Sequence, residues 1–167
     1  MYERGKIYRA NRLVNWSCIL KTAISDIEVM YEDIKEPKKF PVPGHKDLVE
    51  FGWLTYFAYK VKGTNEEIVI ATTRLETMLG DVAIAVNSQD PRYKHLIGKV
   101  CEHPFIKDRE VKIIVDDALV DMNFGTGAVK VTPAHDPNDY ECGMRNKLDF
   151  ISVFDEDGKI NEFGGQY

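Results

Sequence analysis

Four side chains suited to acid, base or electrostatic chemistry lie within ten residues of one another: Lys130, His135, Asp136 and Asp139. A lysine supplies positive charge, the two carboxylates supply negative charge, and a histidine exchanges a proton near neutral pH. Such a set suits a ligand that carries an anionic or ester oxygen at one place and an ammonium group at another.

The neighbouring sequence places these residues at the junction of a strand and a helix. The run 128–132 alternates with the period of a strand, which puts Lys130 on the face opposite its valine neighbours. Asp136 suits a helix N-cap and Pro137 the first helical position, so Asp139 shares a helix face with Asp136. Both carboxylates are also ordinary helix-starting devices, and capping alone is the alternative interpretation.

A second strand-to-helix junction occupies residues 67–80. Residues 68–71 read as a continuous apolar strand, and the spacing of Thr73 and Glu76 predicts a capping box in which Glu76 reaches back to the cap. Gly80 suits the end of that short helix. Because a helix start offers backbone N–H groups and partial positive charge, we expect the two junctions to face one cleft that binds an oxygen-rich ligand.

The two junctions resemble a known family. The stretches ATTRLETMLGD at 71–81 and FGTGAVKVTPAHDPND at 124–139 are similar to the signature segments of the editing domain inserted in valyl-tRNA synthetases. The stretches 12–29 and 42–59 resemble the strands that lead into that domain in the eukaryotic cytosolic form. The resemblance covers nearly the whole chain. It implies that 1–167 is a single editing (CP1) domain, a fragment of a larger synthetase.

The resemblance implies a function rooted in a limit of molecular recognition. A pocket shaped for valine cannot strongly reject threonine, because a hydroxyl replaces a methyl at nearly equal volume, and the valyl enzymes are the known example of this limit. A second site must then hydrolyse the mischarged ester and bind threonine through its hydroxyl. We expect deacylation of threonyl-tRNA(Val), with threonyl-adenylate as a further substrate, by direct attack of an ordered water.

The resemblance also suggests a role for each matching residue. Asp139 is expected to hold the substrate ammonium as an exposed carboxylate, Asp136 to accept the threonine hydroxyl, and Lys130 to stabilise negative charge near the ester or terminal ribose. The expected substrate-binding residues are Thr72, Thr73, Arg74 and Thr77 on the opposite wall, together with Phe124, Thr126 and His135, the last positioning water.

Composition excludes several classes of protein. The chain has 167 residues, of which 44% are hydrophobic, as suits one globular domain. No apolar run reaches the roughly 18–20 residues that span a bilayer, and the first residues do not begin a signal peptide. Three cysteines without CxxC spacing indicate a reducing, cytoplasmic, metal-free protein. We expect a monomeric domain that needs no cofactor, because both ATP-site signatures of class I synthetases are absent.

The net charge of −5 argues against a free-standing nucleic-acid binder. We therefore expect the domain to contact only the acceptor end of tRNA(Val) carrying threonine. The remainder of the synthetase chain is expected to hold the body of the tRNA.

The pattern of short strands and brief helices predicts an α+β, mainly β fold, a closed or nearly closed β-barrel decorated by short helices. The turn at 62–65 predicts a hairpin. The aromatic residues of 51–59 are interpreted as core and sheet packing rather than as a base-stacking surface. The expected strands are 12–16, 24–31, 48–61, 66–72, 82–86, 99–103, 111–116, 128–132 and 150–154, with further short helices at 90–96 and 139–146.

Two alternatives stay open. One is the homologous editing domain of isoleucyl or leucyl enzymes, against which Lys130 and the Thr-Arg-Leu-Glu-Thr run at 73–77 favour the valyl version. The other is a non-catalytic module that docks the tRNA acceptor end. Hydrolysis separates them, since a docking module has no deacylation activity to lose when Asp139 is replaced.

Overall fold

The computed structural model describes all 167 residues, and strands dominate it. The strands are β1 Asn15–Ser17, β2 Thr22–Ile24, β3 Lys38–Phe40, β4 Val49–Phe51, β5 Thr55–Val61, β6 Glu67–Thr72, β7 Ala83–Val86, β8 Val100–Glu102, β9 Glu110–Val115 and β10 Ala128–Val131. The α-helix is α1 Pro137–Asn146, and the 3-10 helices are η1 Tyr2–Arg4, η2 Asp26–Glu28, η3 Leu75–Gly80, η4 Lys94–Leu96 and η5 Glu162–Gly164. The predicted mainly β class is confirmed.

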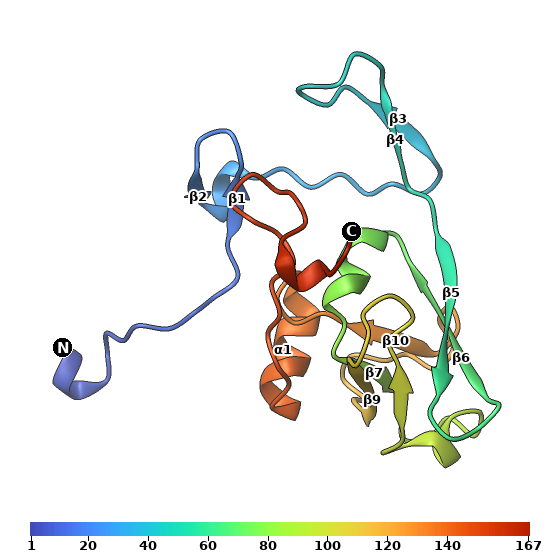
Figure 1. Ribbon diagram of the computed structural model, residues 1–167. Helices are drawn as coiled ribbons and strands as arrows, with labels where there is room; N and C mark the ends of the chain where they lie inside the picture. Colours follow the sequence, from blue (N-terminus) through green and yellow to red (C-terminus); the bar gives the residue numbers. More distant parts are fainter.

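Six strands form one continuous sheet in the order β10-β7-β9-β8-β5-β6. Neighbouring strands are antiparallel except β7 and β9, which run parallel. The two edge strands, β6 and β10, also contact each other, so the sheet curls into the predicted nearly closed barrel (Figure 1). This closure brings together the two segments that follow β6 and β10.

The barrel encloses an apolar core because its strands alternate buried and exposed residues. In β6, for example, Ile68 and Ile70 are buried while Val69 between them is exposed. β7 is buried along its whole length, as expected of a strand covered on both faces. The larger core cluster includes Tyr59, Ile84, Val86 and Ile113, and a smaller one packs α1 against β7 and β10 through Ala83, Ala85, Val120, Val131 and Cys142.

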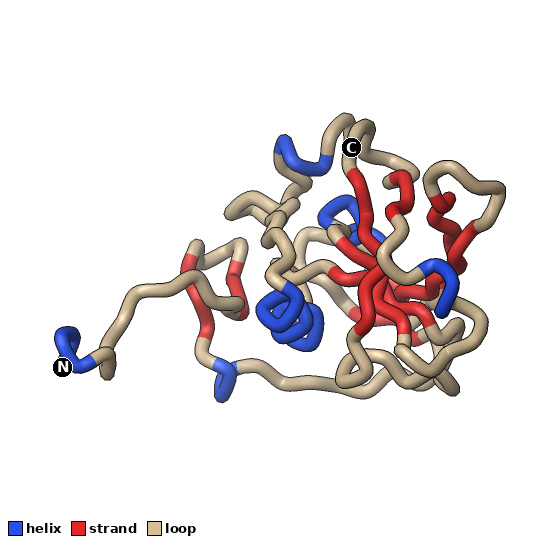
Figure 2. Tube along the Cα trace, turned by 90° about the horizontal axis from the view of Figure 1, so that it is seen from below, coloured by secondary structure: helices blue, strands red, loops and turns tan.

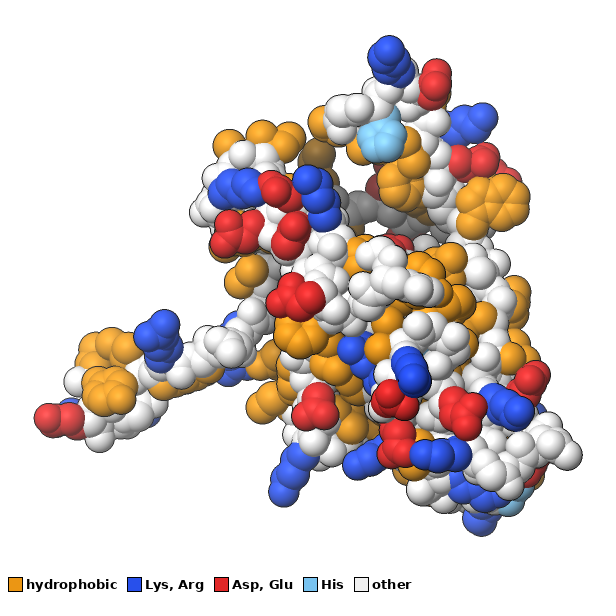
Figure 3. All heavy atoms as spheres, in the orientation of Figure 1, with side chains coloured by type: hydrophobic (Ala, Val, Ile, Leu, Met, Phe, Trp, Pro, Cys, Tyr) orange, Lys and Arg blue, Asp and Glu red, His pale blue; other side chains and the backbone are white.

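Residues 1–54 lie largely outside the barrel, as two small hairpins, β1–β2 and β3–β4, joined by extended chain (Figures 1 and 2). Hydrophobic side chains are exposed on these outlying parts (Figure 3). The first hairpin is held by Trp16, whose indole N–H donates to the Glu156 carbonyl at 3.0 Å, and by an ion pair between Lys21 and Asp157. It is therefore fixed to the turn near the end of the chain.

Three predicted strands are shorter than expected or missing. The strand predicted at 24–31 is wrong beyond its first residue, because Ser25 and Glu28 form a capping box that starts η2. The strand predicted at 12–16 shrinks to β1, and 150–154 contributes only one isolated bridge. These segments lie where few strands are available to pair with them.

The long strand predicted at 48–61 divides into β4 and β5. Gly52 separates the two with a φ of +92°, a left-handed conformation that favours glycine. The division also corrects the interpretation of the aromatic residues. Tyr59 is buried in the core as predicted, but Trp53 and Tyr56 are largely exposed.

Other predicted features are confirmed or reduced. The hairpin around 62–65 is present as β5–β6, and the helix start at Asp136 and Pro137 is present at α1. The helix predicted at 90–96 is reduced to η4. None of the helices is both long enough and apolar enough to cross a membrane.

Candidate active site

A buried ion pair joins the two junctions. Lys130 Nζ lies 3.1 Å from Asp81 Oδ1 and donates to Thr77 Oγ1 at 2.8 Å. Thr132 Oγ1 accepts from Lys130 and donates to Asp81, and the Tyr59 hydroxyl donates to Asp81 Oδ2 at 2.6 Å. Asp81 is 0% exposed and Lys130 is 8% exposed. Since an ammonium group has three protons, all of its donors find acceptors here.

The local sequence explains how these partners meet. Strand alternation in β10 turns Lys130 toward the barrel interior, while Val131 packs on the other face against Cys142 of α1. The prediction that Lys130 and its valine neighbours lie on opposite faces of the strand is thereby confirmed. Thr77 belongs to η3, and Asp81 follows directly after η3. η3 lies between β6 and β7, and because β10 pairs with β7 and also contacts β6, η3 and Asp81 lie beside Lys130.

Two opposing effects act on the buried carboxylate. Burial raises the pKa of Asp81, whereas the Lys130 ammonium and the hydrogen bonds from Thr132 and Tyr59 lower it. Burial and Asp81 together raise the pKa of Tyr59, which therefore remains a hydrogen-bond donor at neutral pH. A carboxylate that receives three donors is in its acceptor-only, ionised form. We conclude that Lys130 and Asp81 are both charged and compensate each other.

The amino terminus of α1 is capped by the side chain of Asp136. Asp136 Oδ1 accepts from the backbone N–H groups of Asn138 at 2.8 Å and Asp139 at 3.1 Å, and Pro137 has no N–H to offer. The expectation that this helix start presents free N–H groups to a ligand is therefore wrong. Asp136 Oδ2 has no protein partner and remains available.

Asp139 is less accessible than expected. Its side chain is 7% exposed, and Oδ2 accepts from the backbone N–H of Thr132 at 2.8 Å. Burial, with a smaller contribution from the nearby Asp136 carboxylate, raises the pKa of Asp139 to about 6 against the opposing effects of the Thr132 hydrogen bond and Lys130. Oδ1 has no hydrogen-bond partner within the protein. Asp139 thus offers one free oxygen, and its charge depends on pH just below neutrality.

The predicted capping box of the first junction does not form. Thr73 is exposed without a hydrogen-bond partner, and Glu76 instead accepts from the Arg74 guanidinium at 3.1 Å. At this turn the backbone N–H of Arg74 donates instead to Thr72 Oγ1. Arg74 Nη1 also donates to the His135 carbonyl at 2.8 Å. The two junctions therefore lie against each other, as expected, although different groups join them.

His135 is neutral and already engaged. Its Nε2 lies 3.0 Å from the backbone N–H of Val153, so Nε2 must accept and the ring proton must reside on Nδ1. Burial and, to a smaller extent, the charges of Arg74 and Lys130 together lower the pKa of His135 to about 4. The ring also packs edge-on against Phe154, with centroids 4.7 Å apart. His135 can donate through Nδ1, but it lacks a free basic nitrogen.

Two predicted site residues lie elsewhere. Phe124 is 82% exposed in the loop before β10, and Thr126 is held by Tyr93, whose hydroxyl donates to the Thr126 carbonyl at 2.7 Å. Both precede β10, whereas Asp139 follows it. A strand advances about 3.3 Å per residue, so the length of β10 separates them from the carboxylates. Of the other predicted residues, Lys130 contacts Thr77, and Arg74 contacts the His135 carbonyl.

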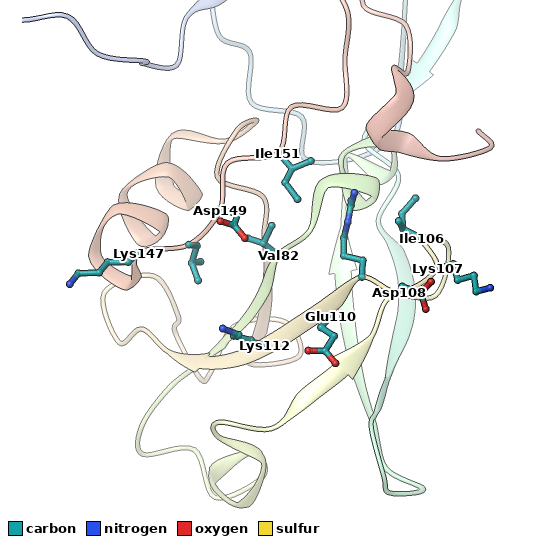
Figure 4. A pocket seen from close by; sticks show the side chains of 11 residues that line it. Val82, Ile106, Lys107, Asp108, Glu110, Lys112, Lys147, Asp149 and Ile151 are labelled. Atoms are coloured by element: carbon teal, nitrogen blue, oxygen red, sulfur yellow. The ribbon is translucent and has the colours of Figure 1, made fainter.

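A separate surface pocket of about 450 Å³ opens beside β9 (Figure 4). Lys112 and Glu110 extend from β9 toward it, and Lys147 and Asp149 border it from the segment after α1. None of the predicted site residues lines this pocket. The chain holds no group of three or more His, Cys, Asp or Glu side chains arranged to bind a metal ion.

Sequence reasoning missed three members of the buried network: Tyr59, Asp81 and Thr132. The sequence did indicate that Asp81 is unusual, because it is the single charged residue between Met78 and Val86 in an otherwise apolar run. A charge in such a run needs a buried partner of opposite sign, and Lys130 in its apolar strand needs the same. Tyr59 and Thr132 carried no comparable signal.

Comparison with known proteins defines the class. Residues 1–152 match the family model described as tRNA synthetases class I (I, L, M and V). The chain belongs to this family. Its similar relatives are named valine–tRNA ligases. A mitochondrial protein of Arabidopsis thaliana is 61% identical, and the match covers 99% of this chain and 15% of that protein. A Schizosaccharomyces pombe protein is 56% identical, and the match covers 100% of this chain and 17% of that protein. The chain thus spans less than a fifth of these relatives.

One solved structure, described as the crystal structure of GlLeuRS-CP1, aligns with 47% of this chain and 44% of its own. The TM-score is 0.41 and the sequence identity 19%. This similarity is too low to establish a common fold.

Proposed function

We propose that the chain is the editing domain of a valine–tRNA ligase and hydrolyses the ester of threonyl-tRNA(Val). One observation carries the proposal. The two junctions converge around the Lys130–Asp81 pair and leave Asp136 and Asp139 with one unpartnered carboxylate oxygen each. Relatives at 54–61% identity are named valine–tRNA ligases, which favours this assignment over an isoleucyl or leucyl one.

The free oxygens suit the two groups that threonine adds to an ester. Oδ1 of Asp139 binds the α-ammonium group, a charge-assisted contact worth about twice a neutral hydrogen bond. Oδ2 of Asp136 accepts the threonine hydroxyl. Valine offers no hydroxyl, so its binding leaves that oxygen without the partner that threonine supplies.

Lys130 contributes positive charge from within the site. Its three protons are occupied, so contact with the substrate requires release of one acceptor. A neutral hydroxyl, from Thr77 or Thr132, is the weaker acceptor and is released in preference to Asp81. The N–H group that has lost its hydroxyl acceptor then donates a hydrogen bond to the ester oxygen and stabilises the negative charge on it as water attacks. Neutral His135 donates to that water or to substrate through Nδ1.

The proposed partners follow from the same assignment. The chain meets the threonylated acceptor end of tRNA(Val), the remainder of the ligase holds the tRNA body, and no cofactor is required. Threonyl-adenylate is a second proposed substrate. Cytoplasmic location stays a prediction, because the matched relatives include ligases named mitochondrial.

The test uses the full-length ligase that contains this chain. Supplied with threonine, ATP and tRNA(Val), the wild-type enzyme is expected to keep threonyl-tRNA(Val) low, and Asp139→Asn to let it accumulate while valylation continues. Arg145→Met, which removes a bidentate arginine from Asp116 at the far end of α1, is the matched control and should not accumulate the product. Equal accumulation by wild type and Asp139→Asn contradicts the proposal.

A further inference from the structure

The loop between β8 and β9 holds η3 through two side chains. His103 and Arg109 close this loop, with the His103 backbone N–H donating to the Arg109 carbonyl at 3.1 Å. Neither residue contacts Lys130. Both side chains reach back instead to the last carbonyl groups of η3, the element that supplies Thr77 and leads into Asp81.

His103 makes a fixed contact with η3. Its Nδ1 accepts from the backbone N–H groups of Phe105 at 3.1 Å and Ile106 at 3.0 Å. Nδ1 therefore carries no proton, so Nε2 does and donates to the Met78 carbonyl at 2.8 Å. Burial lowers the pKa of His103, which keeps this neutral tautomer at physiological pH. The imidazole thus ties the loop to η3 through one defined hydrogen bond.

Arg109 makes the second contact. Nη1 donates to the Leu79 carbonyl, and Nη2 donates to the Phe163 carbonyl of η5 at 3.1 Å. The guanidinium is also near enough for the Asp81 carboxylate to raise its pKa, against the stronger lowering effect of burial. Two successive carbonyls of η3 are therefore anchored, three and two residues before Asp81, which pairs with Lys130.

Gly80, the last residue of η3, is closely packed. A methyl group added at Gly80 would lie 3.0 Å from the Ile151 carbonyl oxygen and 3.1 Å from Thr132 Cγ2. The end of η3 is thus confined between the β8–β9 loop and the segment after β10. Small displacements here would change the distance from Asp81 and Thr77 to the Lys130 ammonium.

We propose that His103 and Arg109 are positioning residues of the site: by anchoring the Met78 and Leu79 carbonyls, they set the place of Thr77 and Asp81 around Lys130. This inference rests on the proposed function. It adds two residues outside both signature segments, and it makes the β8–β9 loop part of the catalytic apparatus without substrate contact.

The experiment measures single-turnover hydrolysis of threonyl-tRNA(Val) by the full-length ligase. Arg109→Met is expected to lower the hydrolysis rate constant about 10- to 100-fold with little change in the half-saturating concentration, because misplacement acts on the reaction geometry. Arg109→Lys, which keeps one donor, should recover part of the rate lost in Arg109→Met. His103→Gln keeps a donor for the Met78 carbonyl and should retain part of the wild-type rate. Arg145→Met is the control for loss of a hydrogen-bonded arginine that does not contact η3.

Hydrogen exchange supplies a readout that does not depend on activity. The backbone N–H of Asp81 donates to the Met78 carbonyl at 3.1 Å and that of Thr77 to the Arg74 carbonyl at 3.2 Å. Both amides should exchange faster in Arg109→Met and at the wild-type rate in Arg145→Met. If Arg109→Met does not fold, Arg109→Lys and His103→Gln carry the same comparison.

The outcomes separate the two proposals. Absence of wild-type hydrolysis contradicts the proposed function itself. If the wild type hydrolyses the ester normally, two results overturn the positioning role alone. Either Arg109→Met retains the wild-type rate, or Arg145→Met slows the reaction as much as Arg109→Met does. A selective rate loss that Arg109→Lys partly restores, with faster exchange at Thr77 and Asp81, supports the positioning role.

Discussion

The Lys130 ammonium lies 3.1 Å from the Asp81 carboxylate, which belongs to a residue 49 positions earlier in the chain. The contact exists because β10 pairs with β7, with Val131 opposite Ala83, two residues after Asp81. It therefore ties the fold to the site. A disturbance of either residue should alter the stability of the barrel and the geometry of the site together.

Removal of Lys130 alone should be strongly destabilising. Lys130→Met leaves Asp81 buried without a counter-charge, and the expected loss is about 3–5 kcal/mol of unfolding free energy. Lys130→Met combined with Asp81→Leu should recover much of that loss, because two apolar side chains need no compensation. Urea denaturation at pH 7.5 measures both variants.

The control for this prediction is Lys62→Met. Lys62 and Glu110 form an exposed ion pair at 2.7 Å, whose removal should cost far less than removal of the buried lysine. If Lys130→Met costs no more than Lys62→Met, the buried pair does not stabilise the fold as argued.

Asp139 should lower stability at neutral pH. Its pKa is about 6 in the folded protein against a reference of 3.8, so the folded state holds the proton more tightly than the unfolded state. Stability should therefore fall as pH rises from about 4 to about 6 and then level off. Asp139→Asn should stabilise the protein above pH 6 by about 1–3 kcal/mol, since one pKa unit corresponds to about 1.4 kcal/mol.

Thermal or urea unfolding from pH 4 to 8 measures this effect, with Asp136→Asn as the matched control. Asparagine caps a helix about as well as aspartate, so the control should change stability little. An Asp139→Asn variant that is less stable than wild type at pH 7.5 would show that the carboxylate is not held at a cost to stability.

The pH dependence of hydrolysis should report Asp139. The substrate ammonium needs the ionised carboxylate, so the rate should rise through about pH 6 and level off above it. His135, with a pKa of about 4, should add no second step between pH 5 and 8. A rate profile that follows a group near pH 7 and loses that step in His135→Gln would instead identify His135 as the base.

His135 should also matter for stability. His135→Ala leaves the Val153 backbone N–H without its acceptor, and the expected cost is about 1–3 kcal/mol. His135→Gln retains an acceptor and should recover part of the loss. Denaturation midpoints of the two variants provide the comparison, and equal losses would argue against the Val153 contact.

Local patterns predicted the parts of the site that depend on local physics. Strand alternation placed Lys130 on the face of β10 opposite its valine neighbours, and the Asp136–Pro137 pair marked the start of α1, because these features are decided within a few residues. The Thr73 capping box failed for a nonlocal reason. Arg74 binds both the His135 carbonyl and Glu76, and so withdraws Glu76 from the cap.

Partners set by strand pairing were not readable from one sequence. Asp81 meets Lys130 because β7, which begins two residues after Asp81, pairs with β10, and no spacing rule fixes that contact. Phe124 and Thr126 precede β10, and the length of that strand separates them from the carboxylates that follow it. The 124–139 signature is continuous in sequence, but its two ends lie at opposite ends of a strand.

The most direct measurement compares hydrolysis of threonyl-tRNA(Val) and valyl-tRNA(Val) by the full-length ligase, wild type beside Asp139→Ala. We expect the threonyl ester to be hydrolysed at least about 100-fold faster than the valyl ester, because only threonine offers the hydroxyl that Asp136 accepts. Asp139→Ala should abolish this hydrolysis. Equal rates for the two esters, or an unchanged threonyl rate in Asp139→Ala, would contradict the editing site described for this chain.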